Sequence, residues 1–424
     1  MTQTPRPTWS WALYDWANSA FATTVMAGFF PLFFKSYWAA GTPPETSTFY
    51  LGWANSGASI VIAAIAPFLG AIADRGSAKK RFLFAFAALG ILNTAALWFV
   101  EKGDWKSAVF FFVLGTIGFM GSNTFYDALL PSVSDDETVD RVSALGFGLG
   151  YIGGGLLFAL NVAMFLKPAV FGISDPTVAI RLSFILVAVW WAVFSIPLFL
   201  FVPEPKHYDA LPLIEGVAAG WRQLLGTLKE LKRLKVVGIF LLAYWLYIDG
   251  VDTIVRMAVD YGMALGFPQD ALIIALLIVQ FVAFPSAIIY GRLAGRIGPK
   301  AAILTAIVAY SFTTVLAYGM NAVWHFYALA VLLGMFQGGI QAISRSLYSR
   351  IIPANKAAEF FGFYNMLGKF AAVIGPALMG TITYVTGDPR KGILSLLLLF
   401  ASGGFLLLKV DVEEGARMAK EELS

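Results

Sequence analysis

Residues 243–262 read AYWLYIDGVDTIVRMAVDYG, an apolar run that carries charged side chains far from either end. Asp249, Asp252 and Arg256 recur at steps of three and four residues, so they lie on one face of a helix. A charge at bilayer depth costs at least about 2.5 kcal/mol on insertion scales, and such side chains usually face a partner or a water-filled path. The stretch therefore predicts a membrane-spanning helix with a functional polar face.

The composition of the whole chain agrees with a membrane protein. Of its 424 residues, 58% are hydrophobic and 13% are charged, whereas a soluble domain carries about 25% charged residues. The net charge of +4 would suggest nucleic-acid binding in a soluble protein, but the basic residues fall mostly between apolar runs, so we expect no nucleic-acid partner. Cysteine is absent, which excludes disulfides and Cys-ligated metals. The first residues lack the pattern of a cleaved signal peptide.

Twelve apolar segments are each long enough to span a bilayer, which takes about 20 residues in a helix. Turn-forming sequences such as ADRGSAKKR, EKGDWK and TGDPRK separate them, and the apolar runs lack the period-two alternation of membrane strands. We therefore predict an all-α membrane protein with spans at 11–37, 48–73, 81–100, 106–131, 142–166, 179–202, 236–262, 270–292, 299–319, 324–349, 357–385 and 391–410.

The two halves of the chain resemble each other. WALYD at 11–15 is similar to WLYID at 245–249, and GAIADRGSAK at 70–79 is similar to GRLAGRIGPK at 291–300. A repeat of about half the chain predicts two pseudo-repeated six-helix bundles. We expect an N-terminal bundle at 1–202, a linker at 203–235, a C-terminal bundle at 236–410 and a tail at 411–424.

Lys and Arg residues concentrate in alternate connections between the spans. By the positive-inside rule, both chain termini are expected in the cytoplasm. The short loops favour a bacterial inner membrane over an organelle membrane. Within the linker at 203–235, apolar residues at three- and four-residue steps alternate with Lys and Arg, which fits a helix lying on the inner membrane surface. A solvated helical linker fits the same pattern.

Two stretches carry a family resemblance. GAIADRGSAKKR at 70–81 is similar to the loop signature of the major facilitator superfamily, with matches at Gly70, Asp74 and Arg75. The opening span at 11–34, WALYDWANSAFATTVMAGFFPLFF, resembles the vacuole effluxer-like branch of that superfamily, the autophagy-related amino-acid effluxers. The resemblance implies a secondary transporter that works by alternating access. It also implies amino-acid export in the fungal members, whereas most bacterial members are uncharacterised.

The resemblance also implies a cytoplasmic gate. In related transporters, an arginine at the position of Arg75 pairs with an acid at the position of Asp127, while Asp74 sits near a helix N-terminus, where negative charge is favoured. The sequence departs from the signature at Gly76, which comes one place early, and Gly295 replaces the acid in the second copy. The alternative is that the basic cluster only sets topology.

A second pair could act at the same gate. Asp15 and Arg345 lie at similar depth in their spans, so we consider an inner gate between them, although a shallow acid could equally reach interfacial water. The predicted gating residues are Asp15, Gly70, Asp74, Arg75, Asp127 and Arg345.

The centre of the predicted site lies in the second half. Asp249 and Lys369 both fall near the middle of their spans, and the family arrangement lets Lys369 face the acids of residues 236–262. Two acids and two bases suit a zwitterion, with its ammonium on Asp249 or Asp252 and its carboxylate on Lys369 or Arg256. Polar neighbours complete the predicted substrate site: Gln280, Gln337, Asn365, Tyr14, Asn18, Asn123 and Tyr126.

Asp249 and Asp252 are the predicted proton carriers, because burial and a nearby base act in opposite directions on a carboxyl group. The alternative is a closed ion-pair network that only orders the second bundle, in which Asp252 and Arg256 satisfy each other at i, i+4 spacing. Asp260 is expected near the outer surface, in contact with solvent. The glycines of GFGLGYIGGGL, from Gly146 to Gly155, indicate close helix packing, or alternatively a hinge.

Other chemistry is not apparent. The sequence has no phosphate-binding loop of the Walker type, and its two histidines are far apart and make no metal set. We therefore expect no enzyme activity, no cofactor and no metal. The expected partners are a small-molecule solute, protons and the lipid bilayer, with the protein a monomer. Two alternatives stay open, namely a transporter of amphiphiles such as lipids or drugs, and a non-transporting receptor or scaffold.

Overall fold

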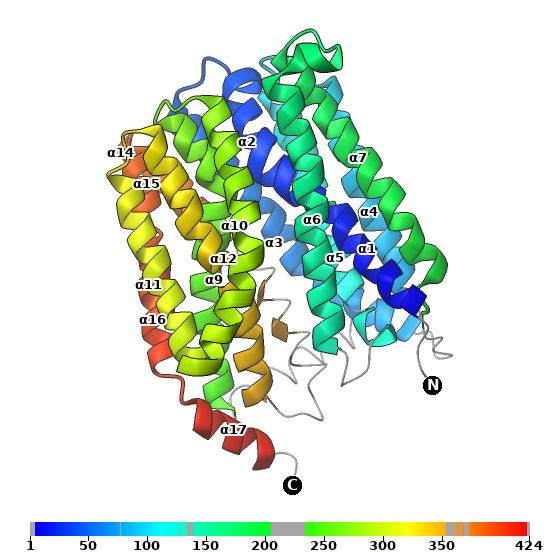
Figure 1. Cartoon of the computed structure of the whole chain (residues 1–424), viewed down its shortest axis with the longest axis vertical. Helices are drawn as coiled ribbons and strands as arrows, with labels where there is room; N and C mark the ends of the chain where they lie inside the picture. Colours follow the sequence, from blue (N-terminus) through cyan, green and yellow to red (C-terminus); the bar gives the residue numbers. More distant parts are fainter. Residues whose placement is uncertain are drawn as a thin grey trace. The chain divides into compact units, whose positions relative to one another are not determined.

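The computed structural model describes residues 5–76, 78–127, 129–133, 139–204, 234–352, 360, 363–364, 367–368 and 373–421. Every regular element in these ranges is a helix (Figure 1), which confirms the predicted all-α class. Ten helical segments of this part of the chain are long and apolar enough to cross a membrane. They correspond to ten of the predicted spans. Of the other two, the span at 48–73 lies within α3 (Pro44–Gly76), and the span at 357–385 is described at its end as α14 (Ile374–Thr386).

The chain divides into two compact units. Unit 1 comprises Met1–Pro43 and Ala64–Trp221, and unit 2 comprises Pro44–Ala63 and Arg222–Ser424. This division differs from the predicted bundle at 1–202, because the first part of α3 packs with unit 2 rather than with unit 1. Most of the predicted linker, with its possible amphipathic helix, lies outside the described residues.

Unit 1 is built from long helices that pack in pairs. Its helices are α1 (Pro5–Ala20), α4 (Lys79–Ala96), α5 (Trp105–Asp127), α6 (Val139–Leu166) and α7 (Pro176–Phe201). Helix α4 packs along α5, while α1 packs along α6 and α7. Shorter elements continue or connect them: η1 (Phe21–Phe29), α2 (Phe30–Phe33), η2 (Phe34–Trp38), η3 (Leu97–Phe99), η4 (Leu130–Ser132) and η5 (Pro168–Phe171).

Glycines bring α6 and α1 together. A Cβ atom added at Gly153 would lie 2.6 Å from the Trp16 ring, and one at Gly154 would lie 3.0 Å from the Ser19 carbonyl oxygen. Only glycine allows this approach, which agrees with the packing interpretation of the glycine run. Gly148 differs, because an added Cβ there would have no neighbour within 4 Å.

Unit 2 has a similar build. Its helices are α9 (Lys235–Ala264), α10 (Gln269–Ile297), α11 (Pro299–Tyr318), α12 (Val323–Ile351), α14, α15 (Pro389–Leu394), α16 (Leu397–Leu408) and α17 (Val412–Glu421). Helix α10 packs along α12, α16 packs along α9, and α14 contacts both α9 and α15.

The first half of α3 is fastened to unit 2 by polar contacts. The Thr48 hydroxyl donates to Asp260 Oδ2 at 2.6 Å, and the Ser56 hydroxyl donates to the Val373 carbonyl oxygen at 2.9 Å. Asp260 is completely buried, so the expectation that it contacts solvent is wrong. Sequence depth alone placed this residue near the surface, but α3 provides its cover.

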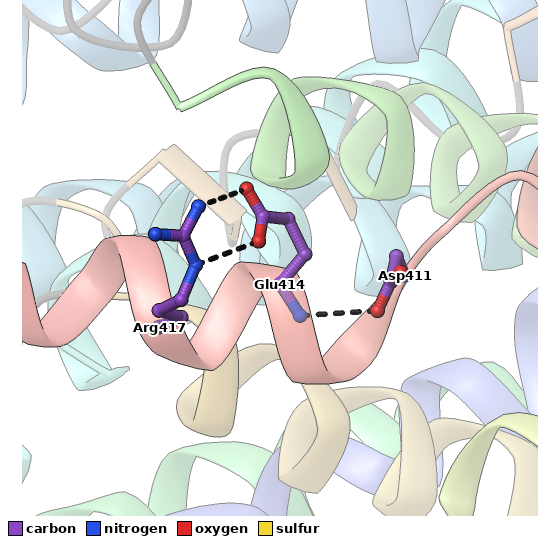
Figure 2. Close-up of polar contacts among 3 residues, drawn as sticks. All are labelled: Asp411, Glu414 and Arg417. Carbon is purple, nitrogen blue, oxygen red and sulfur yellow. Dashed lines mark hydrogen bonds and ion pairs between the residues drawn. The ribbon is translucent and has the colours of Figure 1, made fainter.

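Helix α17 is the last helix of unit 2, and polar contacts form at its first turn. Asp411 accepts the Glu414 amide at 3.0 Å, and Arg417 donates twice to the Glu414 carboxylate, at 2.8 and 2.7 Å (Figure 2). The hydrogen bonds from Arg417 lower the pKa of the Glu414 carboxyl. These groups are exposed and stabilise the helix little. The packing of α17 on α9 and α12 contributes more.

We expect Gly415→Val to disturb this packing. A Cβ at Gly415 would already lie 2.9 Å from Ile351 Cγ2 and from Val236 Cγ1, so a larger side chain overpacks the contact at a cost of about 1–3 kcal/mol. The apparent melting temperature in detergent should fall accordingly. Ala416→Val, on a half-buried neighbour, is the control, and an equal loss in both variants would contradict the prediction.

Candidate functional site

Asp249 binds the start of another helix. Its Oδ2 accepts the backbone amide of Ile374 at 2.9 Å and its Oδ1 accepts that of Gly375, also at 2.9 Å. These are the first amides of α14, which have no partner within their own helix. A negative charge is favoured at a helix N-terminus, and the Asp249 side chain is completely buried. Asp249 therefore caps α14 from the middle of α9.

Two neighbours make this contact possible, and neither was predicted. The Thr253 hydroxyl donates to the Asp249 carbonyl oxygen at 2.7 Å and lies 3.4 Å from Asp249 Oδ1. A Cβ at Gly375 would be 1.9 Å from the Thr253 hydroxyl and 2.8 Å from Asp249 Oδ1, so only glycine fits. The sequence did contain a signal, because Pro376 directly after this glycine is typical of a first helical turn.

Asp252 and Arg256 lie one turn apart on α9 but do not touch. No ion pair joins them in the described part of the chain, and Arg256 Nη1 is buried without a hydrogen-bond partner. The i, i+4 contact that the alternative of a closed ion-pair network expected is therefore not formed between these two side chains. The two charges still attract through space. Within the described residues, no group donates a hydrogen bond to the Asp252 carboxylate and none accepts one from Arg256 Nη1.

Aromatic and hydroxyl groups line the neighbouring turns of unit 2. Tyr244 stacks on Tyr364 with ring centroids 4.2 Å apart, and the Tyr247 and Ser344 hydroxyls hydrogen-bond at 2.7 Å. Arg345 follows Ser344 on α12 and acts electrostatically on Tyr244. Arg345, which the sequence assigned to the gate, thus lies on α12 next to a serine that bonds to α9.

The remaining predicted residues of unit 2 fall into two groups. Gln280 on α10 and Gln337 on α12 are half-buried, and Gln337 Oε1 is a buried acceptor without a hydrogen-bond partner. Lys369 and Asn365 lie outside the described residues, so their roles stay predictions.

Unit 1 contains a second polar cluster, formed by α1 and α5. The Asn18 amide donates to Asn123 Oδ1, and Trp11 Nε1 donates to the Tyr126 carbonyl oxygen at 3.0 Å. The Tyr126 ring lies 5.1 Å from that of Tyr14. The structure thus brings together Tyr14, Asn18, Asn123 and Tyr126, the four residues of the first half that the sequence assigned to the substrate site.

The predicted gating acids of unit 1 lie beside this cluster. Asp15 faces α6, and Asp127 at the end of α5 is close enough to act electrostatically on it. Gly70, Asp74 and Arg75 belong to α3, but the side chains of Asp74 and Arg75 lie outside the described residues, so the pairing of Arg75 with Asp127 stays a prediction. So does the pairing of Asp15 with Arg345, which would join unit 1 to unit 2.

No metal centre is apparent in the described ranges, where no three His, Cys, Asp or Glu side chains form a group that could hold an ion.

Comparisons with known proteins agree with the fold and the predicted branch. The chain matches the family described as "Vacuole effluxer Atg22 like" over residues 3–420. It is 39% identical to the uncharacterized MFS-type transporter YxiO of Bacillus subtilis, over 97% of this chain and 96% of that protein. It is 28% identical to autophagy-related protein 22 of Yarrowia lipolytica, where the match covers 66% of this chain and 52% of that longer protein. The match thus spans about half the length of this fungal relative.

Solved structures of transporters share the fold. A D-xylose–proton symporter superposes with a TM-score of 0.67 over 96% of both chains, at 14% sequence identity. The nucleoside transporter NupG superposes with a TM-score of 0.66 over 95% of this chain and 98% of that one, also at 14% identity. At this identity the likeness concerns the fold alone, and it supports the predicted major facilitator architecture.

We expect Asp249 and Asp252 to respond differently to neutralisation. Asp249→Ala leaves the Ile374 and Gly375 amides without their acceptor, at about 1–3 kcal/mol for each buried group. The apparent melting temperature in detergent should fall strongly. Asp252→Ala removes no hydrogen bond within the described residues and should change it little. Equal losses in the two variants would contradict the assignment of Asp249 as a cap.

Proposed function

The chain belongs to the vacuole effluxer Atg22-like family and is a transporter of the major facilitator type, and from this premise we propose what it carries and how. Its substrate is a small polar or zwitterionic solute, with an amino acid as the leading candidate. It moves this solute by alternating access, as an exporter or exchanger driven by protons. Both termini lie in the cytoplasm, and the membrane is the bacterial inner membrane.

The arrangement of Asp252 and Arg256 carries this proposal. The Asp252 carboxylate and the Arg256 guanidinium lie one helical turn apart at the middle of a span. Within the described residues, no ion pair joins them. Unpaired charges at bilayer depth are costly and mark solute or ion pathways. A zwitterion offers both an ammonium for Asp252 and a carboxylate for Arg256, and guanidinium binds carboxylate with two parallel hydrogen bonds. Lys369, Asn365 and Gln337 are the proposed further contacts.

Asp252 is the better proton carrier of the two predicted acids. Both oxygens of Asp249 already accept backbone amides, whereas Asp252 accepts no hydrogen bond from the described residues. A solute carboxylate that binds Arg256 weakens the attraction between Arg256 and Asp252, and this favours a proton on Asp252. Solute binding and proton binding are thereby linked on one turn of α9.

Helix α3 supports alternating access. It starts in unit 2 and ends in unit 1, so any relative movement of the units must either bend α3 or separate its first half from α9 and α14. The contacts there include two hydrogen bonds, from Thr48 to Asp260 and from Ser56 to the Val373 carbonyl oxygen, together with the Phe49 ring, whose centroid lies 5.0 Å from that of Tyr384. We propose that they open and close as a gate opposite the cytoplasmic one.

Solute counterflow in liposomes tests the substrate site. We expect wild-type protein to accumulate labelled amino acids and Arg256→Gln to lose at least about tenfold in apparent affinity, since a hydrogen bond to a charged group contributes about 1.5–3 kcal/mol. Asp252→Asn should abolish accumulation driven by a pH gradient while retaining exchange. Lys369→Ala should resemble Arg256→Gln.

Arg417→Gln is the matched control, because it removes an exposed arginine of α17. Folded wild-type protein that accumulates no amino acid would contradict this substrate class and favour amphiphilic solutes. Full activity of Arg256→Gln would contradict the assignment of the site.

Cysteine labelling tests the gate, and the natural chain contains no cysteine that would interfere. Asn55→Cys places a reporter on α3 at a buried position, to be labelled in cells by a membrane-impermeant maleimide. Thr48→Val removes the buried hydrogen bond to Asp260, worth about 1 kcal/mol, and should raise labelling about fivefold by opening the gate.

Two further variants control this experiment. Thr48→Ser keeps a hydroxyl and should label like wild type. Thr314→Val removes a hydroxyl that bonds only within α11, to the Tyr310 carbonyl oxygen, and should also label like wild type. If Thr48→Val labels no faster than Thr314→Val, the first half of α3 moves with unit 2 and is not a gate.

A further inference from the structure

A lysine at the start of α4 binds the end of α7. Lys80, the second residue of α4, donates from Nζ to the Phe199 carbonyl oxygen at 2.7 Å and to the Val202 carbonyl oxygen at 2.9 Å. Its backbone amide donates to Glu204 Oε1 at 3.3 Å, just beyond the same helix end. The last carbonyl groups of a helix have no partner within it, and a positive charge is favoured there. Lys80 therefore caps the C-terminus of α7.

An arginine of α7 caps its partner helix in return. Arg181, in the second turn of α7, donates from Nε to the Trp98 carbonyl oxygen at 2.9 Å, and its Nη2 donates to the same oxygen. Trp98 lies in η3, directly after α4, and its ring centroid is 5.2 Å from the Arg181 guanidinium carbon. Each helix thus begins beside the end of the other, so the pair is antiparallel and has a basic cap at both ends.

Unit 2 repeats the lysine cap. Lys300, the second residue of α11, donates from Nζ to the Leu408 carbonyl oxygen at 2.9 Å and to the Val410 carbonyl oxygen at 2.6 Å. These carbonyl groups lie at the end of α16, as those bound by Lys80 lie at the end of α7. Both lysines are half-buried and occupy the second position of their helices.

Unit 2 also repeats the arginine cap. Arg390, the second residue of α15, donates from Nη1 to the carbonyl oxygen of Tyr318, the last residue of α11. Helices α15 and α16 lie within one segment that is long and apolar enough to cross a membrane, Pro389–Leu408. The pair that α11 forms with this segment therefore has a basic cap at both ends, like the pair of α4 and α7.

The two arginines make the same contact from different turns. Asp175 is the N-cap of α7 and Asp388 is the N-cap of α15. Arg181 follows its N-cap by six residues, whereas Arg390 follows its own by two. The difference of four residues is about one helical turn, so both side chains lie on the same side of their helices. The contact itself, rather than the residue position, is common to the two units.

We propose that these four basic caps, Lys80 and Arg181 in unit 1 and Lys300 and Arg390 in unit 2, hold one antiparallel helix pair of each unit at both ends, so that each pair keeps its geometry during transport. A hydrogen bond from a charged donor is about twice as strong as one between neutral groups. Caps at opposite ends of a pair oppose both sliding and separation of its helices. The role in transport rests on the proposed function, whereas the rigidity of the pairs does not.

Hydrogen–deuterium exchange with mass spectrometry tests each lysine cap at its own helix end, in purified protein in lipid nanodiscs. Lys80→Met should make amides in the last turn of α7 exchange about tenfold faster, because this turn opens more often without its charged donor. Lys300→Met should do the same at the end of α16 and leave α7 unchanged. Arg81→Met is the matched control, because Arg81 follows Lys80 in α4 and is exposed.

The arginine caps are tested in the same way. Arg181→Gln should raise exchange about tenfold at the end of α4, and Arg390→Gln should do so at the end of α11. Lys391→Gln removes an exposed charge next to Arg390 and should leave exchange unchanged. The four substitutions act at four separate helix ends, so the test remains if one variant folds poorly. Wild-type exchange in the cap variants, or equal changes in cap and control variants, would overturn the proposal.

Spin labels test whether the caps keep a pair rigid. The natural chain contains no cysteine, so Phe84→Cys on α4 and Val193→Cys on α7, both at exposed positions, carry the only two nitroxides. We expect a narrow distance distribution with the caps intact and a broader one after Lys80→Met is combined with Arg181→Gln. A broad distribution with the caps intact, or a narrow one without them, would contradict the proposal. Neither experiment uses a solute, so a negative counterflow result leaves both intact.

Discussion

The capping of α14 by Asp249 organises unit 2. In the bilayer no water reaches the first amides of a helix, so a helix that begins at membrane depth needs acceptors from its neighbours. Asp249 supplies them to Ile374 and Gly375, while Ser56 holds the carbonyl oxygen of the preceding residue, Val373. The segment from Val373 to Gly375 is thus hydrogen-bonded to α9 through its amides and to α3 through a carbonyl oxygen. The positions of three helices depend on this turn.

The two units share one local arrangement, an aspartate packed against a glycine, but the aspartate has different partners in each unit. In each unit, the acid of the repeated motif lies against glycine on another helix, with Asp15 at Gly146 of α6 and Asp249 at Gly375 of α14. Helix α6 runs without interruption from Val139 to Leu166, so its amides there bond within the helix and leave Asp15 without a backbone donor. Helix α14 begins beside Asp249, and its first two amides donate hydrogen bonds to that carboxylate. The repeat therefore yields a structural carboxylate in unit 2, whereas the Asp15 carboxylate of unit 1 accepts no hydrogen bond from the described residues.

Sequence reasoning found what depends on local pattern. The spans follow from the length and hydropathy of single segments, and the family follows from the opening span, so neither requires knowledge of distant contacts. The polar side chains of unit 1 were assigned to the substrate site as polar residues within two apolar spans, and the structure brings these four residues together. The contacts that sequence reasoning missed involve partners that are far apart along the chain. Asp260 looks shallow until α3 covers it, and Asp249 looks like a free charge until the amides of α14 meet it.

The acids of α9 differ in their hydrogen-bond partners, and these partners distinguish their roles. The three acids have the same chemistry and lie within twelve residues, so sequence alone treated Asp249 and Asp252 alike. In the structure, Asp249 binds two amides and Asp260 binds the Thr48 hydroxyl. Asp252 accepts no hydrogen bond from the described residues and lies one turn from an arginine with a buried, unpartnered nitrogen. Because a charge without a partner at bilayer depth is costly, this difference within the described residues is the physical basis for proposing that Asp252 and Arg256, rather than Asp249, contact the solute.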